Sequence, residues 1–321
     1  MSITGGAAAD KITGSPKDDT INPGTASDTA LVDTIDAGAG ADTLNYAVAN
    51  LIGTNAIIDS IEGGDGVDSI VVTGAIAIDS SSTGLAKATG VEKLVAASST
   101  SALAHSIVLS TDARLSGFTT IDLSLNTSAT STATVNLSGS TNNFTVIGIA
   151  GGTNTFTANA GDDSLTGGAL NDTFTFGAAQ LTSGDAVVGG AGTLDTIAIS
   201  AADTLEDTDF TNVSGVEVLT LTGASTVTLG AKGLAAGIVK VIGGAGANTI
   251  TSANAITVDL DTAAGTSLTT GAATGNYTIT TTDVTTATIT ATGSTGTLNI
   301  TSANLTAGAL ALATGSGYVS V

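Results

Sequence analysis

The sequence predicts an all-β chain that is wound as a parallel β-helix, or β-roll, solenoid. Three observations lead to this fold class. The composition is poor in helix-forming residues, a nine-residue repeat is rich in glycine and aspartate, and apolar residues alternate with threonine near the C-terminus. Long surface helices need Glu, Lys, Arg and Gln, whereas Asp, Gly, Thr, Ser and Val favour turns and strands. The composition therefore argues against a helical bundle.

Charge and composition also exclude several classes of partner. The chain of 321 residues has 28 acidic and 7 basic residues, a net charge of −21 and no cysteine. Seven scattered cations form no basic stripe, so we expect no nucleic-acid binding. No apolar run approaches the ~18 residues that span a bilayer, so we expect no membrane insertion. The first residues resemble no cleaved secretory signal, and thiolate metal sites are excluded.

The plainest repeat has the form Gly-Gly-x-Gly-x-Asp-x-apolar-x. It is complete at residues 63–71 and recurs with substitutions at 37–45 and 243–251. A copy with one inserted residue begins at Gly189, and three consecutive copies occupy 149–175. Two degenerate copies stand in tandem near the start, where they carry Asp10 and Asp19. The apolar position is predicted to point inward from a short strand, while glycine allows the chain to turn sharply.

The same repeat predicts a metal site in its turns. Aspartate at the sixth position projects from the turn, where glycine carbonyls also face outward. Carboxylate and carbonyl oxygens from two stacked turns would form an all-oxygen site, which suits Ca²⁺. This nonapeptide pattern is typical of calcium-binding β-helix repeats.

These residues resemble the RTX family of type I-secreted bacterial proteins, whose parallel β-rolls bind calcium as cofactor. The resemblance implies that the sixth-position aspartates and the neighbouring glycine carbonyls are ligands. Asn154 and Asn248 replace the aspartate, and most copies are isolated, so we expect a few ions and no full ladder. By position, the implied metal-binding residues are Asp10, Asp19, Asp42, Gly64, Gly66, Asp68, Gly161, Asp163, Gly168, Asp172 and Asp195.

A longer repeat indicates that a unit of about 125 residues is duplicated. Residues 63–96 resemble 189–222. Each contains a glycine-rich nonapeptide followed by a Gly-Val-Glu-x-Leu segment. Asp68 stands 24 residues before Glu92, and Asp195 stands 22 residues before Glu217. Such segments resemble those of RTX-type bacterial surface-layer (S-layer) proteins. Glu92 and Glu217 are either calcium ligands or ordinary residues beside a strand.

The C-terminal region is predicted to consist of strands with an uncharged outer face. Residues 277–282 and 287–292 alternate apolar residues with threonine, which is the period of a half-buried strand. Such a face could pair with another copy of the chain. We therefore divide the sequence into an RTX-like β-roll segment, a β-solenoid segment, an RTX nonapeptide core and a Thr-rich β-solenoid with a possible assembly surface, at residues 1–75, 76–148, 149–200 and 201–321.

A few other polar residues have two interpretations. His105 has no catalytic context and is predicted to be a surface residue. Asp162 and Asp163 could form a catalytic carboxylate pair, but the nonapeptide register explains Asp163 better. The acidic group at 203–209 could be a further calcium loop or a solvated turn. We therefore expect no enzyme activity.

Three classes of function compete on these observations. The first is a secreted, calcium-binding structural protein that self-assembles into a surface layer, filament or extracellular matrix, with a cell-surface polysaccharide as a candidate partner. The second is a calcium-dependent adhesin or an ice-binding solenoid that uses the Thr rows of 278–292. The third is the calcium-binding tail of a secreted hydrolase, which no catalytic motif supports. The RTX resemblance implies type I secretion through an uncleaved C-terminal signal, for which 310–321 is a candidate.

Overall fold

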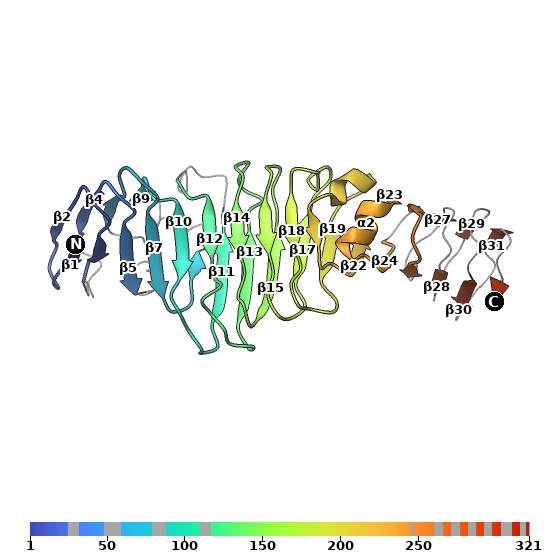
Figure 1. Ribbon diagram of the computed structural model, residues 1–321, viewed down its shortest axis with the longest axis horizontal. Helices are drawn as coiled ribbons and strands as arrows, with labels where there is room; N and C mark the ends of the chain where they lie inside the picture. The colour runs from blue at the N-terminus through green and yellow to red at the C-terminus, as the bar shows by residue number, and fades with distance from the viewer. Residues whose placement is uncertain are drawn as a thin grey trace. The chain divides into compact units, whose positions relative to one another are not determined.

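The computed structural model confirms the predicted fold class, a parallel β-solenoid in which each strand pairs with the strand one coil further along the chain (Figure 1). We call one full coil a rung. The described residues form two compact units, unit 1 (1–159 and 163–170) and unit 2 (160–162 and 171–321), and each is considered by itself. The division falls inside the predicted segment 149–200, and the four-segment division remains a prediction. The structure describes residues 1–24, 32–47, 59–78, 88–109, 117–244, 247–259, 266–270, 277–281, 287–291, 297–302, 310–314 and 319–320.

Unit 1 contains three parallel sheets. One sheet has the order β1-β3-β5-β7-β10-β12-β14-β16, a second has β2-β4-β6-β9, and a third has β8-β11-β13-β15. The strands are β1 (Ser2–Thr4), β2 (Lys11–Ser15), β3 (Thr20–Asn22), β4 (Thr34–Gly38), β5 (Thr43–Ala47), β6 (Ser60–Glu62), β7 (Ser69–Thr73), β8 (Ala77–Ile78), β9 (Ala88–Thr89), β10 (Lys93–Ala96), β11 (Ala104–Val108), β12 (Thr120–Asp122), β13 (Thr132–Asn136), β14 (Thr145–Ile147), β15 (Thr153–Thr157) and β16 (Ser164–Thr166).

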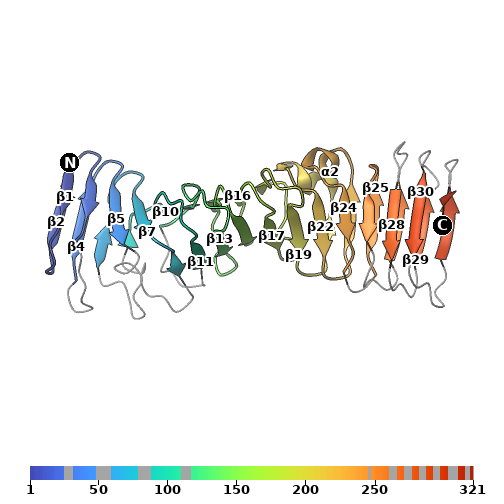
Figure 2. The same ribbon diagram turned by 90° about the horizontal axis from the view of Figure 1, so that it is seen from below.

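Unit 2 repeats this plan and adds the only helices among the described residues. Its sheets have the orders β17-β19-β22-β24-β26-β28-β30-β32, β20-β23-β25-β27-β29-β31 and β18-β21 (Figure 2). The elements are β17 (Thr173–Phe176), β18 (Ala186–Val188), β19 (Thr196–Ile199), β20 (Thr204–Leu205), η3 (Asp207–Phe210), β21 (Val213–Ser214), β22 (Val218–Leu221), β23 (Thr226–Leu229), α2 (Ala231–Ala236), β24 (Lys240–Ile242), β25 (Thr249–Ser252), β26 (Thr257–Asp259), β27 (Thr266–Thr270), β28 (Tyr277–Thr281), β29 (Ala287–Ala291), β30 (Leu298–Ser302), β31 (Leu310–Thr314) and β32 (Val319–Ser320). No helix among the described residues is long and apolar enough to cross a membrane.

The core consists of columns of aliphatic side chains that stack from rung to rung. In unit 1, Leu44 pairs with Ile70 and Ile70 with Leu94, and all three side chains are buried. Successive side chains of a strand alternate between its faces, so the residues flanking each core position point outward. In unit 2 the column contains Phe174 and Ile197, both fully buried. The inward orientation predicted for the eighth nonapeptide position is thus confirmed.

Two expectations from the sequence were wrong. His105 is buried, because it lies on the inner face of β11, opposite Ala133 of β13 and next to Ile76, whose N–H donates to its Nδ1. The two Thr-rich segments near the C-terminus do not share one face, because β28 and β29 belong to different sheets. Both segments are strands, as predicted. The two strands are consecutive in the sequence, but consecutive strands of the solenoid belong to different sheets.

Candidate metal-binding turns

The residue that precedes each strand of the first sheet forms a column that runs along unit 1. Asp19, Asp42, Asp68 and Glu92 occupy successive rungs, and we call them the first carboxylate column. The backbone N–H of Asp19 donates to Oδ1 of Asp42 at 2.8 Å, and that of Asp42 donates to Oδ1 of Asp68 at 2.7 Å. The N–H of Asp68 in turn donates to Oε2 of Glu92 at 2.8 Å. Each carboxylate oxygen therefore accepts an N–H that a backbone carbonyl would accept within the sheet. The hydrogen bonding between rungs continues in this way for one residue beyond the strand.

Two other columns repeat this arrangement. In the second carboxylate column, the N–H groups of Asp10 and Asp33 donate to Oδ1 of Asp33 and Asp59 at 2.7 and 2.9 Å. Asp33 and Asp59 were missed in the sequence because they lie outside the nine-residue register. Their separations of 23 and 26 residues, which equal those from Asp19 to Asp42 to Asp68, were the available signal.

The third carboxylate column lies in unit 2. The N–H of Asp172 donates to Oδ1 of Asp195 at 2.7 Å, and the N–H of Asp195 donates to Oε2 of Glu217 at 2.9 Å. It therefore ends in a glutamate, as the first column does at Glu92. Asp68 with Glu92 and Asp195 with Glu217, which correspond in the longer repeat, thus make the same hydrogen bonds.

The second carboxylate oxygen separates the aspartates into two groups. In the first group it accepts a backbone N–H from the residue four positions earlier. Gly6 donates to Asp10 at 2.5 Å, Ser15 to Asp19 at 2.6 Å and Asn159 to Asp163 at 3.2 Å. Oδ1 of Asp163 also accepts from the N–H of Phe144 at 2.9 Å. In the turn of Asp163, both carboxylate oxygens therefore accept backbone N–H groups.

In the second group this oxygen is buried without a hydrogen-bond partner. Among the side chains that the structure describes, Oδ2 of Asp42, Asp68 and Asp195 is in this state. Asp68 and Asp195 are 0% exposed. Leaving a buried polar atom unpaired is costly, and a buried charge is costlier. The residue four positions before Asp42 and Asp68 is a glycine with positive φ, Gly38 at 104° and Gly64 at 103°. These turns therefore use a different backbone conformation at the position that supplies the donor in the first group.

The electrostatics of this second group are unfavourable to negative charge. Burial raises the pKa of Asp68, and the like charges of Asp42 and Glu92 add to the rise. Burial likewise raises the pKa of Asp195, with further contributions from Asp172 and Glu217. A cation beside these oxygens would remove both costs, because it replaces lost hydration and separates like charges.

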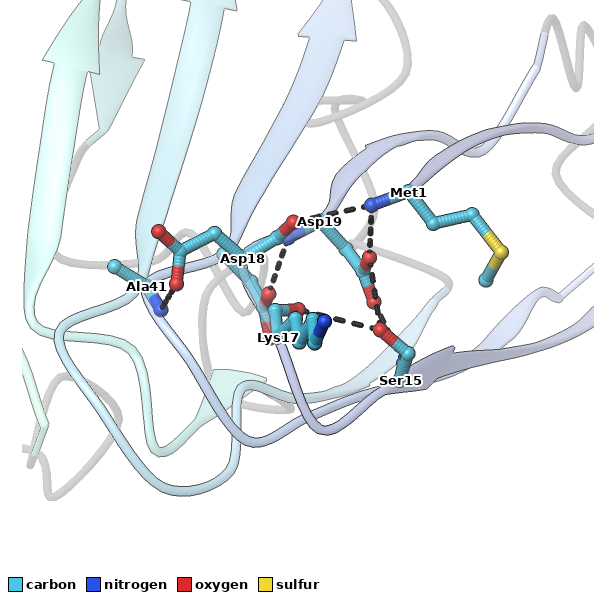
Figure 3. A network of polar contacts seen from close by, with 7 residues as sticks. Met1, Ser15, Lys17, Asp18, Asp19 and Ala41 are labelled. Atoms are coloured by element: carbon cyan, nitrogen blue, oxygen red, sulfur yellow. Dashed lines mark hydrogen bonds and ion pairs between the residues drawn. The ribbon is translucent and has the colours of Figure 1, made fainter.

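Asp19 shows what a cation does in the same column. The N-terminal ammonium of Met1 forms an ion pair with Oδ1 of Asp19 and donates to the carbonyl of Asp18 at 3.0 Å (Figure 3). Ser15 donates to the same carboxylate through its N–H and its hydroxyl. The hydrogen bond from the ammonium is the largest cause of the lowered pKa of Asp19. A carboxylate and a carbonyl of this column thus already hold one positive group.

Glycines leave room beside the unpaired oxygens. A Cβ on Gly63 would lie 1.8 Å from the carbonyl oxygen of Gly90 and 2.7 Å from Oδ2 of Asp68. In unit 2, a Cβ on Gly189 would lie 1.7 Å from the carbonyl oxygen of Gly215. A side chain at either glycine would therefore collide with oxygen atoms. At Gly63, the absence of a side chain lets the carbonyl oxygen of Gly90 and the carboxylate oxygen of Asp68 approach the same place.

The residues around Asp42, Asp68 and Asp195 fit a calcium ion. No group of three or more His, Cys, Asp or Glu side chains among the described residues could hold a metal by itself. Backbone carbonyls must therefore supply part of any ligand set, as hard oxygen-binding cations allow. Calcium bound there would supply positive charge to the column, while the chain supplies the buried carboxylate and a carbonyl that approaches over a glycine.

The remaining predicted ligands have the following positions. Gly64 and Gly66 have positive φ of 103° and 140°, and their Cβ atoms would lie 1.8 Å from the carbonyls of Gly38 and Gly40. A Cβ on Gly168 would lie 2.2 Å from the carbonyl oxygen of Ile149, while Gly161 lies in a bend. The assignment of all eleven residues to calcium remains a prediction.

The acidic group at 203–209 has a structural role at Asp207. Its carboxylate accepts N–H groups of Gly230 at 2.6 Å, Gly233 at 2.9 Å and Lys232 at 3.2 Å, at the start of α2. Although burial opposes it, these bonds lower the pKa of Asp207. Asp209 and Glu206 form a reciprocal cap on η3. The three carboxylates thus bind helix ends.

Comparison with known proteins agrees with this geometry. Residues 2–30, 32–47 and 150–179 match the model of the RTX calcium-binding nonapeptide repeat, in four copies. The chain thus carries segments similar to RTX nonapeptide repeats, which bind Ca²⁺. Such repeats are typical of extracellular proteins that leave the cell by type I secretion. Searches of curated proteins and of solved structures gave no match to this chain.

Proposed function

We propose that the protein is an extracellular, non-enzymatic structural protein that folds on calcium binding and then assembles with further copies of itself into a layer or filament. The observation that supports this most strongly is the pair of carboxylate columns that end in glutamate. They place like charges on successive rungs, with buried oxygens that have no partner. Such columns stack well only when cations neutralise them.

The columns suggest how export and folding are coupled. In cytoplasm with little calcium, a chain of net charge −21 repels itself and stays unfolded, which suits export. Outside the cell, abundant calcium binds the folded form alone and shifts the equilibrium toward it. Secretion by the type I route, suggested by the RTX repeats, would deliver the chain in this unfolded state.

The sheet β20-β23-β25-β27-β29-β31 supplies a candidate assembly surface. None of its strands contains a charged residue. Thr226 and Thr249 are exposed on it and lie opposite each other in register. An uncharged sheet face can approach a copy of itself or a neutral polysaccharide without charge repulsion.

Calcium titration of chelator-stripped protein tests both parts of the proposal. Circular dichroism should show β-structure appearing with calcium, and electron microscopy should show ordered sheets or filaments in the same samples. Thr226→Lys should leave the dichroism unchanged and reduce assembly. Thr134→Lys, at an exposed position of β13 in unit 1, is the matched control. Assembly in excess chelator, or equal assembly by Thr226→Lys, contradicts the proposal.

Threonine columns favour a second candidate, an ice-binding or adhesive surface. Thr228, Thr251, Thr269 and Thr290 occupy one register position on four successive strands of that same sheet. A regular array of identical hydroxyl-bearing residues suits a periodic ligand. If the calcium-loaded protein stays monomeric, slows ice growth, and loses that activity in Thr226→Lys, this candidate replaces assembly.

A further inference from the structure

The first and third carboxylate columns end in the same way in separate units. Glu92 follows Asp68, and Glu217 follows Asp195. At the next register positions the residues are Thr119 and Val239, so the glutamates are the last carboxylates before a gap in each column. Neither glutamate belongs to a nonapeptide, and both lie outside the segments that match the RTX repeat model.

We propose that each glutamate completes a calcium site with the preceding aspartate. Asp68, Glu92 and the carbonyl of Gly90 form one site, and Asp195, Glu217 and the carbonyl of Gly215 form its counterpart. The inference rests on the proposed calcium-dependent function and extends it to two mixed sites, each made from one nonapeptide turn and one Gly-Val-Glu turn.

Both aspartates of the proposed sites carry an unpaired oxygen. Oδ2 of Asp68 and of Asp195 is buried without a hydrogen-bond partner, and both residues are 0% exposed. Oδ1 of the same side chains is already used by the amide of the preceding rung. A Cβ on Gly63 would lie 2.7 Å from Oδ2 of Asp68 and 1.8 Å from the carbonyl oxygen of Gly90, so these two oxygens lie close to each other.

The glutamates are held in place by the same amides that they satisfy. Oε2 of Glu92 accepts the N–H of Asp68 at 2.8 Å, and Oε2 of Glu217 accepts the N–H of Asp195 at 2.9 Å. This bond uses one oxygen of each carboxylate and fixes the group next to the aspartate. In the part of the chain that the structure describes, no Lys or Arg forms an ion pair with any of these carboxylates.

The turn before each glutamate explains why the longer side chain is needed. Gly90 and Gly215 have nearly equal positive φ, 62° and 64°, and the valine that follows each is buried. The valine occupies the interior of the solenoid. The turn is also shorter than the complete glycine-rich turn, because only the Gly-Val-Glu residues separate its flanking strands. A glutamate carries its carboxylate one methylene further from the backbone. The same Gly-Val-Glu turn, with the same hydrogen bond from its glutamate, occurs in both units, which favours a shared role over coincidence.

Calcium binding by the full chain tests the proposal. Equilibrium dialysis with metal analysis gives the number of ions bound, and calorimetric titration gives their affinities. Glu92→Gln and Glu217→Gln keep an amide oxygen that can accept the aspartate N–H but remove the charge. Each variant should lose one ion, or bind it about tenfold more weakly, and the double variant should show both losses. Glu62→Gln and Glu206→Gln are matched controls outside the columns.

The outcomes separate this inference from the proposed function. If the wild-type chain binds calcium and all glutamine variants bind it equally well, the two mixed sites are wrong and the proposed function survives. Equal losses in the controls would overturn the inference as well, because they indicate a general effect of charge. If the wild-type chain binds no calcium, the proposed function itself fails.

A second pair of variants covers the case in which glutamine prevents folding. Glu92→Asp and Glu217→Asp keep the charge and shorten the side chain. We expect an unchanged circular dichroism spectrum in calcium and a weaker affinity at one site in each variant. Unchanged affinity with an intact fold would overturn the inference.

Discussion

Residues 68 and 248 occupy the same position of the nonapeptide, one as aspartate and the other as asparagine, and both are fully buried. Oδ1 of each accepts a backbone N–H from the preceding rung, from Asp42 at 2.7 Å and from Ser225 at 3.0 Å. They differ in the second atom of the head group. Nδ2 of Asn248 donates to the carbonyl of Gly244 at 3.1 Å, whereas Oδ2 of Asp68 has no partner.

The difference shows how one atom decides whether a rung needs a metal. The turn presents a carbonyl oxygen to this position, which an amide N–H can satisfy and a carboxylate oxygen cannot. Asn154 follows the same rule, since its Nδ2 donates to the carbonyl of Ile149 at 3.2 Å. Asparagine therefore builds rungs in which both head-group atoms are satisfied without a metal. Asp42, Asp68 and Asp195 instead leave one buried oxygen that a cation would satisfy.

Calcium removal should give the largest effect, because it acts on aspartate rungs alone. In chelator, the amides of Asp42 and Asp68 should lose most of their protection from hydrogen exchange, while that of Ser225 should keep its protection. Each ion contributes about 2.7 kcal/mol when calcium exceeds its Kd a hundredfold. Exchange measured by mass spectrometry with and without calcium checks this. Uniform loss across both kinds of rung would contradict the distinction.

Asp68→Asn should convert an aspartate rung into the asparagine type. The new Nδ2 can donate to a turn carbonyl, so in chelator the variant should exceed the wild type in unfolding free energy by about 1–3 kcal/mol. In calcium the order should reverse, because the variant loses a charged ligand. Urea unfolding under both conditions measures the crossing. Asp195→Asn should behave alike in unit 2, and a variant less stable in both conditions would refute the interpretation.

Asn248→Asp should make the opposite conversion, with a smaller effect in calcium. It removes the donor to Gly244 and leaves a buried carboxylate oxygen, which should cost about 1–3 kcal/mol in chelator. Added calcium should restore part of this loss. Thermal unfolding across a calcium series tests the restoration, and a melting temperature that calcium leaves unchanged would count against it.

His105 offers the smallest test, since it is a buried polar group that is satisfied without metal. Its Nδ1 accepts the N–H of Ile76 at 3.1 Å, and burial lowers its pKa. The unfolded chain, with a pKa of about 6.5, therefore binds a proton before the folded chain does. Stability should be complete above that value and should fall by up to about 1.4 kcal/mol per unit as pH drops below it.

His105→Gln should flatten this slope in calcium-saturated protein. Unfolding in urea between pH 7 and 5 measures the slope in both proteins. Tyr277→Phe, which alters a buried polar group in unit 2 without adding a titrating group in this range, serves as control. A slope that persists in His105→Gln would assign the effect to other groups.

Local pattern was enough to predict the rungs themselves. In the complete nonapeptide, the apolar position Ile70 is fully buried in β7, and Phe156 and Phe174 are fully buried in their strands. Such positions follow from a period within nine residues. The sixth-position aspartates were also recognisable, because the residue type and the glycines around it carry the chemistry.

Relations between rungs could not be predicted in the same way. Asp33 and Glu92 matter because of the residue one rung before them, and rungs differ in length by several residues. The prediction for His105 was wrong for a similar reason, since its inward position depends on its neighbours in other rungs, Ala133 and Ile76. The state of Oδ2 in Asp68 depends on backbone orientation in the turn, which residue types alone do not determine.

The hydrogen bonds of the carboxylate columns also limit how such a chain can evolve. In the first column, the amides of Asp19, Asp42 and Asp68 are each satisfied by the side chain of the following rung, at separations of 23, 26 and 24 residues. A duplication that inserts one whole rung supplies a new amide together with a new acceptor. An insertion of half a rung supplies neither and shifts inward residues outward. Genes of this kind can therefore lengthen by complete rungs, and the paired endings at Glu92 and Glu217 are what growth by whole blocks would leave.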